Sequence, residues 1–163
     1  MHSSLRHQAG FTLIETIVAL MVLTVGIVPA YYLAQSSQVI ADSVRDDLIA
    51  ANLAQEGAEV IHGIRDTNWF SSQSFNNGLG AGNYEVEWNS ELPLGVFQDR
   101  YLRVDTNGRY NYTTGTSSRF KRKIIITAVG ANELKIISQV TWKERARDRT
   151  VEVESHLFNW YTP

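Results

Sequence analysis

The N-terminal stretch that decides the fold of this chain is GFTLIETIVALMVLTVGIVPAYYL, residues 10–33. A short polar leader with one arginine, Arg6, precedes it, and residues 16–33 carry no charged side chain. From Phe11 to Leu33 the segment is long enough for a membrane-spanning helix, which needs about 20 apolar residues. Glu15 places a carboxylate near the start of this segment. Because an ionisable group inside a membrane helix is costly unless it is paired, we expect Glu15 to have a function.

Gly10, Phe11 and Glu15, within the string Gly-Phe-Thr-Leu-Ile-Glu, resemble the signature shared by the precursors of type IV pilins and type II secretion pseudopilins. The resemblance implies that a prepilin peptidase cuts after Gly10 and that the new N-terminal residue, Phe11, is methylated. It also implies that Glu15 meets the N-terminal amine of a neighbouring subunit during filament assembly. Opposite charges in apolar surroundings offset part of each other's desolvation cost. A glutamate at the membrane interface, favoured by the helix dipole, remains an alternative.

Two other interpretations of the N-terminus stay open. A secretory signal peptide could be cut after Ala30, where Val28 and Ala30 supply the small residues of a cleavage site. Glu15 argues against it, since such peptides carry basic residues at this point. A plain membrane anchor would explain the length and leave Glu15 unexplained. In each case Arg6 predicts a cytoplasmic leader, with the bulk of the chain on the other side.

The helical pattern continues beyond the apolar run. We predict one helix from Phe11 to about Arg65, bent near Gly26 and Pro29, because a proline inside a helix removes a backbone hydrogen bond. Its second half, residues 34–66, is amphipathic. The apolar positions that recur at three- and four-residue steps are Ile40, Val44, Leu48, Ala51, Ala54, Ala58, Ile61 and Ile64. This stripe needs a sheet to cover it.

The remainder of the chain predicts an antiparallel sheet. The connection over residues 67–83 is irregular, and Trp69, Phe70 and Phe75 within it are expected to pack partly onto the head. Strands are predicted at residues 84–88, 101–104, 110–112, 123–129, 134–142 and 150–158. Asn107-Gly108 is a hairpin signal. Short links, including one over residues 144–149, predict a meander with one face on the helix.

The expected fold class is therefore α+β, a type IV pilin-like fold with a long N-terminal helix packed on a C-terminal antiparallel sheet. The expected segments are a cleaved leader (1–10), a transmembrane or filament-core half of the helix (11–33), an amphipathic half (34–66) and a β head (67–163). The chain has 163 residues, a net charge of −2 and no cysteine. A disulfide, which many pilins have, is thus excluded, and bulk charge indicates no partner.

Basic residues are the other candidate site. Seven of them could form a patch for an anionic partner such as DNA: Arg119, Lys121, Arg122, Lys123, Arg145, Arg147 and Arg149. Solvated turns, or complementary faces between subunits, explain the same residues. Residues 105–108 resemble a calcium loop without its later glutamate, and a hairpin turn accounts for them. Asn111-Tyr112-Thr113 fits a glycosylation acceptor.

No catalytic, metal or cofactor spacing appears in the sequence, and Glu152 and Glu154 alternate on the solvent face of a strand. We therefore expect a structural subunit, most similar to a minor pilin of the V type through residues 140–143 and 151–160. Its expected partners are a prepilin peptidase, other pilin subunits and the inner-membrane assembly platform. It would cross the bacterial inner membrane once and then enter an extracellular or periplasmic filament. The alternatives are a type II secretion pseudopilin and a DNA- or surface-binding pilus-tip module.

Overall fold

The computed structural model describes residue 10 and residues 12–161, which form one helix and eight strands. The chain divides into two compact units, residues 1–43 and residues 44–163, and the helix α1 crosses this boundary. The elements in chain order are α1 (Leu13–Phe70), β1 (Gly82–Glu85), β2 (Gly95–Val96), β3 (Arg103–Val104), β4 (Tyr110–Asn111), β5 (Thr116–Ser117), β6 (Phe120–Ala128), β7 (Glu133–Glu144) and β8 (Arg147–Phe158).

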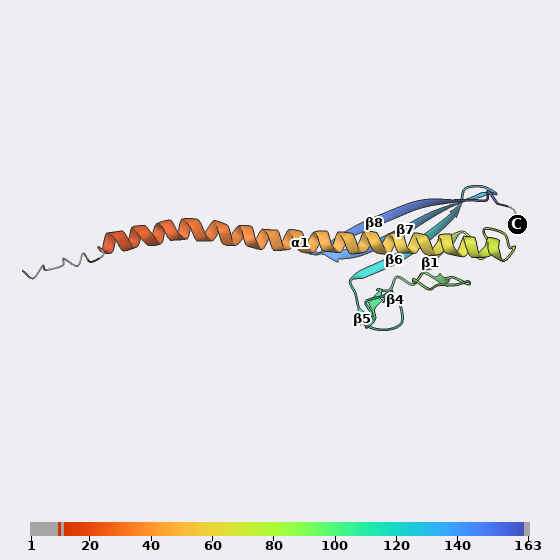
Figure 1. Cartoon of the computed structure of the whole chain (residues 1–163), viewed down its shortest axis with the longest axis horizontal. Helices are drawn as coiled ribbons and strands as arrows, with labels where there is room; N and C mark the ends of the chain where they lie inside the picture. Colours follow the sequence, from red (N-terminus) through yellow and green to blue (C-terminus); the bar gives the residue numbers. More distant parts are fainter. Residues whose placement is uncertain (1–9, 11, 162–163) are drawn as a thin grey trace, which may run out of the picture. The chain divides into compact units, whose positions relative to one another are not determined.

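The predicted α+β architecture, with a long N-terminal helix and an antiparallel sheet, is confirmed. The helix begins at Leu13 instead of Phe11 and ends at Phe70, beyond the predicted end near Arg65. Pro29 lies inside α1 without interrupting it, and Figure 1 shows a gentle curve in the first part of the helix. A proline removes one backbone donor, but the turns on either side of it still hold the helix together.

One face of α1 is buried against the sheet in the second unit. The buried residues are Ala50, Leu53, Ala54, Gly57, Ala58, Ile61, Ile64, Asn68 and Trp69. The predicted stripe is thus correct from Ala54 onward and wrong before it, because Ile40, Val44 and Leu48 are each at least half exposed. Leu48 is two residues from Ala50, which is about 200° around the helix. The three side chains therefore follow a different face from the one that the sheet covers.

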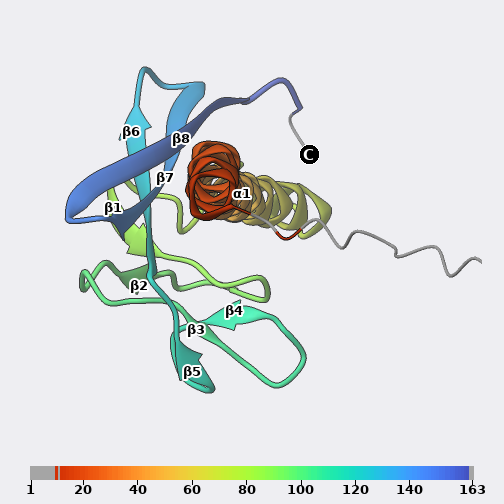
Figure 2. The same ribbon diagram turned by 90° about the vertical axis from the view of Figure 1, so that its left-hand side faces the viewer.

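The main sheet has five strands in the order β2-β1-β6-β7-β8, all pairing antiparallel. The predicted meander holds for β6, β7 and β8. It fails for the earlier strands, because β1 pairs with β6, and β3 to β5 form a separate small sheet in the order β4-β3-β5. Figure 2 shows α1 on one face of β6, β7 and β8, with the small sheet to the side.

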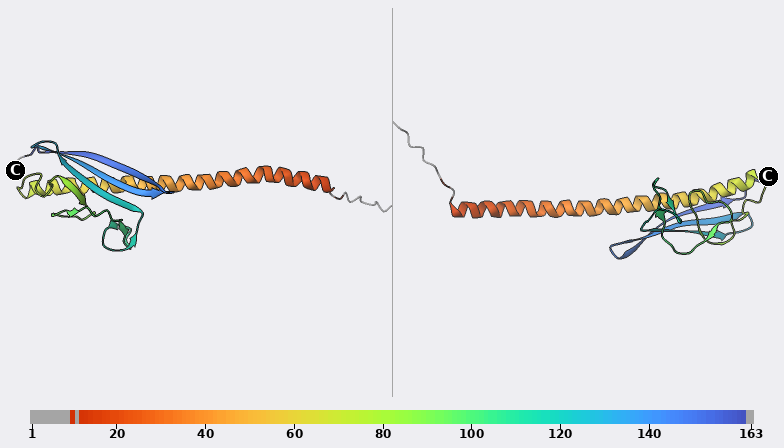
Figure 3. Two further views of the ribbon diagram at one scale, coloured as in Figure 1. Left: turned by 180° about the vertical axis from the view of Figure 1, so that it is seen from behind. Right: turned by 90° about the horizontal axis from the view of Figure 1, so that it is seen from below.

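The alternation of buried and more exposed side chains along the long strands shows where the core lies. In β6, Phe120, Arg122, Ile124 and Ile126 are buried and the residues between them are only partly covered. These buried residues face α1, and the further views in Figure 3 show the same layering of helix on sheet. In β8 the predicted division between an inner face and an outer face is found, with Glu152 and Glu154 exposed. Two clusters of apolar side chains fill the space between helix and strands.

Two turns explain how strands meet. The predicted hairpin at Asn107-Gly108 joins β3 to β4, with Gly108 at a φ of 79° and its amide donating to Asp105 O at 3.1 Å. The link between β7 and β8 is shorter than predicted, because only Arg145 and Ala146 separate the strands. Their φ angles of 47° and 66° fit a two-residue turn that usually requires Asn or Gly. Without either residue the sequence carried no signal for this turn.

The connection after α1 differs from its prediction at one aromatic residue. Phe75 is 3% exposed and Trp69 9%, so both pack onto the head as expected. Phe70, the last residue of α1, is 92% exposed. Trp69, the preceding residue, points inward instead, because successive helical residues are about 100° apart around the axis.

At Gly57 the backbone of α1 lies close against the side chains of the sheet. A Cβ atom there would lie 2.6 Å from Ser138 Oγ, 2.8 Å from Ile124 Cδ1 and 3.1 Å from Arg122 Cδ. All three neighbours are fully buried, so none can move away cheaply. Gly63 lies on the same helix with no atom within 4 Å of such a Cβ.

The two glycines therefore predict opposite outcomes for one substitution. Gly63→Ala should raise the free energy of unfolding by about 0.5–1 kcal/mol, because alanine is the better helix former. Gly57→Ala should lower it by about 1–3 kcal/mol, because overpacking outweighs that gain. Urea unfolding of the full chain in detergent, followed by tryptophan fluorescence, measures both. An equal or greater stability for Gly57→Ala would contradict the close packing.

Candidate functional site

Thr12 caps the N-terminus of α1. Its Oγ1 accepts a hydrogen bond from the backbone N–H of Glu15 at 3.3 Å, and its carbonyl oxygen accepts from the N–H of Thr16 at 3.1 Å. Threonine at the cap and glutamate three residues later is the spacing of a capping box. This spacing was visible in the sequence and explains why the helix begins at Leu13, after the predicted Phe11.

Glu15 lies in the first turn of α1 with an exposed side chain. The partial positive charge at a helix N-terminus favours a carboxylate at this position. Gly10 is exposed, with no atom within 4 Å of a Cβ built on it. Phe11 and the leader residues 1–9 lie outside the described residues, so the predicted cleavage and methylation at Phe11 stay predictions.

The apolar part of α1 has no cover within the described part of its own unit. Every large apolar side chain from Leu13 to Leu33 is about half exposed or more. Among the described residues α1 is the one helix long and apolar enough to cross a membrane, and its apolar window is 0% buried. A helix that is apolar on all sides needs lipid or other protein around it.

Comparison with known proteins identifies the N-terminal segment. Residues 5–31 match the family model described as the prokaryotic N-terminal methylation motif. The chain carries the N-terminal signature of type IV pilins and pseudopilins. No curated protein matches this pilin-like chain, and no solved structure matches it. The matched residues end two positions before the end of the apolar segment 11–33 and do not reach the second unit, residues 44–163.

In the second unit, two predicted patch residues pair with α1. Arg119 Nη1 lies 2.6 Å from Asp46 Oδ2, and Arg149 Nη2 lies 3.3 Å from Asp47 Oδ1. Both pairs are partly exposed, so each stabilises the fold only weakly. Both arginines are nevertheless already paired with carboxylates of the same chain.

Arg122 is the predicted patch residue that the structure places in the interior. Its side chain is fully buried, where Nη1 donates to Leu53 O at 2.9 Å and to Glu56 Oε1 at 2.8 Å, and Nη2 donates to Val86 O. Arg122 therefore joins α1, β6 and the segment after β1, and it cannot belong to an exposed basic surface. No local pattern in the sequence indicates this burial, because the partners are remote along the chain.

Arg122 also accepts a hydrogen bond through its backbone. The hydroxyl of Tyr112 donates to Arg122 O at 2.9 Å. Burial raises the pKa of Tyr112 to about 12, so this hydroxyl remains protonated and keeps donating at any physiological pH.

The other four patch residues are less enclosed. Lys121 Nζ lies 2.8 Å from Asp99 Oδ2, and Lys123 Nζ lies 5.8 Å from the ring centroid of Phe97. Arg145 and Arg147 are exposed at the β7–β8 turn and form no ion pair within 4 Å among the described residues. Arg122 is thus excluded from an exposed patch, and four of the seven residues, Arg119, Lys121, Arg122 and Arg149, pair with acids of the same chain.

The two loop motifs have structural explanations. Asp105 Oδ1 accepts from the backbone N–H groups of Asn107 at 2.7 Å and Arg109 at 2.9 Å, so its carboxylate closes the hairpin. No cluster of potential metal ligands occurs among the described residues. Asn111 is 5% exposed, and its Oδ1 accepts from the N–H groups of Thr113 and Thr114. A side chain held in this way is not presented for glycosylation.

One pair of polar residues was missed in the sequence. His62 Nε2 and Ser155 Oγ lie 2.7 Å apart between α1 and β8. Burial lowers the pKa of His62, helped by nearby Arg65, so the imidazole is neutral near pH 7. No acid is hydrogen-bonded to its other nitrogen among the described residues. The pair serves to hold the helix against the sheet.

The burial of Arg122 yields a second stability prediction. Arg122→Met should lower the free energy of unfolding by about 2–4 kcal/mol, because Val86 O and Glu56 then lose a charged donor inside the protein. Lys123→Met, at the next position of the same strand, should change it by less than about 0.5 kcal/mol. Urea titrations of both variants in the same detergent make the comparison. Equal effects at the two positions would contradict the structural role of Arg122.

Proposed function

We propose that this chain is a structural subunit of a type IV pilus-like filament, processed by a prepilin peptidase and assembled through its N-terminal helix. The observation that carries the proposal is the first part of α1, which is apolar on every side and bears one carboxylate, Glu15, in its first turn. It lies largely within residues 5–31, which match the N-terminal methylation motif. A membrane covers such a helix before assembly, and neighbouring helices can cover it afterwards.

In this proposal, Glu15 fixes the axial alignment of neighbouring subunits in the filament. Cleavage after Gly10 would create a positively charged amine on Phe11, four residues before the carboxylate. Glu15 is in the first turn of its own helix, so it is too close to the N-terminus for that helix to fold back on its own amine. The amine of a neighbouring subunit can approach it laterally, and apolar surroundings strengthen the attraction between the two charges. Subunits out of register would leave both charges unpaired.

The remaining assignments follow from the same proposal. Residues 1–10 are the cleaved leader and residues 11–33 the membrane and filament-core segment. The head then lies outside the cytoplasm, because Arg6 keeps the leader inside. The head includes residues 44–66 of α1 as well as residues 67–163, since the sheet packs on that part of the helix. The partners are the peptidase, the inner-membrane platform and other pilin subunits.

Within the family we propose a minor pilin, with a type II secretion pseudopilin as the alternative. Both use the same N-terminal chemistry. A DNA-binding tip is less well supported, because Arg119, Lys121 and Arg149 pair with acids of the chain and Arg122 is buried. Internal pairing of these residues favours a structural subunit over one that binds an anionic partner.

Processing can be tested directly by mass. In cells with a prepilin peptidase, the mature chain should begin at Phe11 and carry one added methyl group, as intact mass and N-terminal sequencing would show. Deleting the peptidase should leave the chain beginning at Met1. A mature chain that begins at Tyr31 would instead establish a secretory signal peptide and refute the proposal.

The role of Glu15 is tested separately from cleavage. Glu15→Gln keeps the shape and removes the charge, so processing after Gly10 should be normal. Incorporation into sheared filaments should fall roughly tenfold or more, because the neighbour's amine would lose its buried partner. Quantitative immunoblots of filament and membrane fractions measure the ratio.

The matched control for this experiment is Glu91→Gln, which removes one exposed carboxylate from the head. It should assemble as the unsubstituted chain does. Normal incorporation of Glu15→Gln would refute the pairing while leaving the cleavage result intact.

A further inference from the structure

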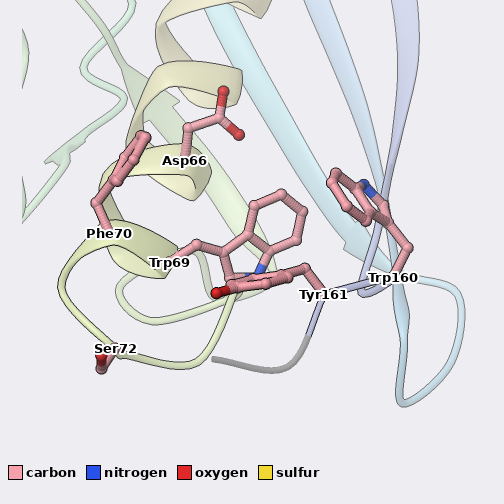
Figure 4. A pocket seen from close by; sticks show the side chains of 6 residues that line it. All are labelled: Asp66, Trp69, Phe70, Ser72, Trp160 and Tyr161. Atoms are coloured by element: carbon pink, nitrogen blue, oxygen red, sulfur yellow. The ribbon is translucent and has the colours of Figure 1, made fainter.

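Three aromatic side chains form a cluster where the end of α1 meets the end of the chain. The ring centroid of Trp69 lies 5.0 Å from that of Trp160 and 5.9 Å from that of Tyr161, both in edge-to-face geometry. Such contacts stabilise the cluster and leave ring faces available on its outer side. Figure 4 shows the rings grouped together, with Phe70 beside them.

An open pocket of about 540 Å³ lies over this cluster, lined by Asp66, Trp69, Phe70, Ser72, Trp160 and Tyr161. Its volume falls in the range of small-molecule sites, about 300–1,000 Å³. Trp160 is 73% exposed, and Phe70 is 92% exposed although the sequence led us to expect it to be packed. Exposed aromatic rings beside a hollow indicate a binding surface, because burying them is favourable.

The polar groups of the pocket are balanced in charge. Asp66 Oδ1 lies 2.7 Å from Arg65 Nη2, and the Arg65 guanidinium also lies over the Trp69 ring at 4.7 Å. Arg65 therefore balances the charge of the Asp66 carboxylate and also covers one face of the Trp69 ring. This arrangement disfavours a charged ligand, since a second cation would meet Arg65 and an anion would meet Asp66.

Two hydrogen-bonding groups at the rim remain unused. Asp66 is 47% exposed, and its Oδ2 atom has no hydrogen-bond partner among the described residues. The hydroxyl of Ser72 is exposed, likewise without a partner in that part of the chain. In the view of Figure 4 Asp66 lies above the Trp69 ring, and Ser72 lies below and to the left of it.

We propose that this pocket binds the pyranose ring of a neutral sugar. A pyranose has an apolar C–H face that can stack on an exposed aromatic ring and equatorial hydroxyls that can donate to Asp66 and accept from Ser72. The balanced charge, the exposed rings and the two free polar groups match those features together. The proposal does not depend on the filament function, because every residue involved lies in the second unit.

The four tryptophans of the chain provide the test, because each gives one indole N–H signal in a spectrum of tryptophan-labelled protein. The full chain is prepared in a polyoxyethylene detergent, since detergents with sugar head groups would compete. The probes are methyl glucoside, methyl galactoside, N-acetylglucosamine and maltose. Trp88, which is 46% exposed, and Trp142, which is buried, serve as internal references.

At least one of these sugars should shift the signals of Trp69 and Trp160 and leave those of Trp88 and Trp142 in place. The shifts should saturate with a dissociation constant on the order of 1 mM, as expected for a ligand of this size. Trp160→Ala should abolish the shift of Trp69. The control Trp88→Ala, which removes an exposed tryptophan elsewhere on the head, should preserve it.

Three results would overturn the proposal. Absence of saturable shifts at Trp69 and Trp160 for all four sugars refutes it, as do equal shifts at Trp88. A stronger response to tetramethylammonium than to any sugar would assign the pocket to a cation. Shifts that grow with protein concentration in the absence of sugar would assign the aromatic surface to contact with a second copy of this chain.

Discussion

The close approach of α1 to the sheet at Gly57 is the constraint on which the second unit depends. With no side chain at this position, the helix backbone comes within reach of Ser138 and Ile124. The same proximity lets Arg122 donate from the sheet to Leu53 O on the helix. A bulkier residue at Gly57 would push the helix and the sheet apart. The buried guanidinium of Arg122 would then lose its hydrogen-bond acceptors on the helix. Packing and hydrogen bonding are therefore coupled at one place.

This coupling matters because the chain has no cysteine to reinforce the head. The stability of a domain of this size, without a disulfide, comes from its apolar clusters and from its hydrogen-bonded polar groups. The second unit takes residues from both the helix and the sheet into that core. The part of α1 that packs on the sheet is thus an integral layer of the head.

The apolar run and the long strands could be predicted from sequence because both are local periodic patterns. Residues 16–33 lack any polar stripe, and β6 to β8 alternate along their length. Periodicity cannot tell which face of a helix is buried when two apolar stripes both have helical spacing. Ile40, Val44 and Leu48 recur at four-residue steps, and Ala54, Ala58 and Ile61 at steps of four and three, so both sets fit a helical stripe. Only the position of the sheet decides which stripe is covered. Without the tertiary fold that choice has no local signal.

Two features that sequence reasoning missed depend on remote partners. Arg122 resembled its exposed basic neighbours until Glu56, far along the chain, was brought beside it. The aromatic pocket joins Trp69 at the end of α1 to Trp160 at the end of the chain, and no motif spans that separation. The candidate assembly site is the opposite case, since Gly10, Phe11 and Glu15 are adjacent in sequence. Enzymes that process many precursors must recognise a local motif, whereas a fold can assemble a ligand site from any residues that it brings together.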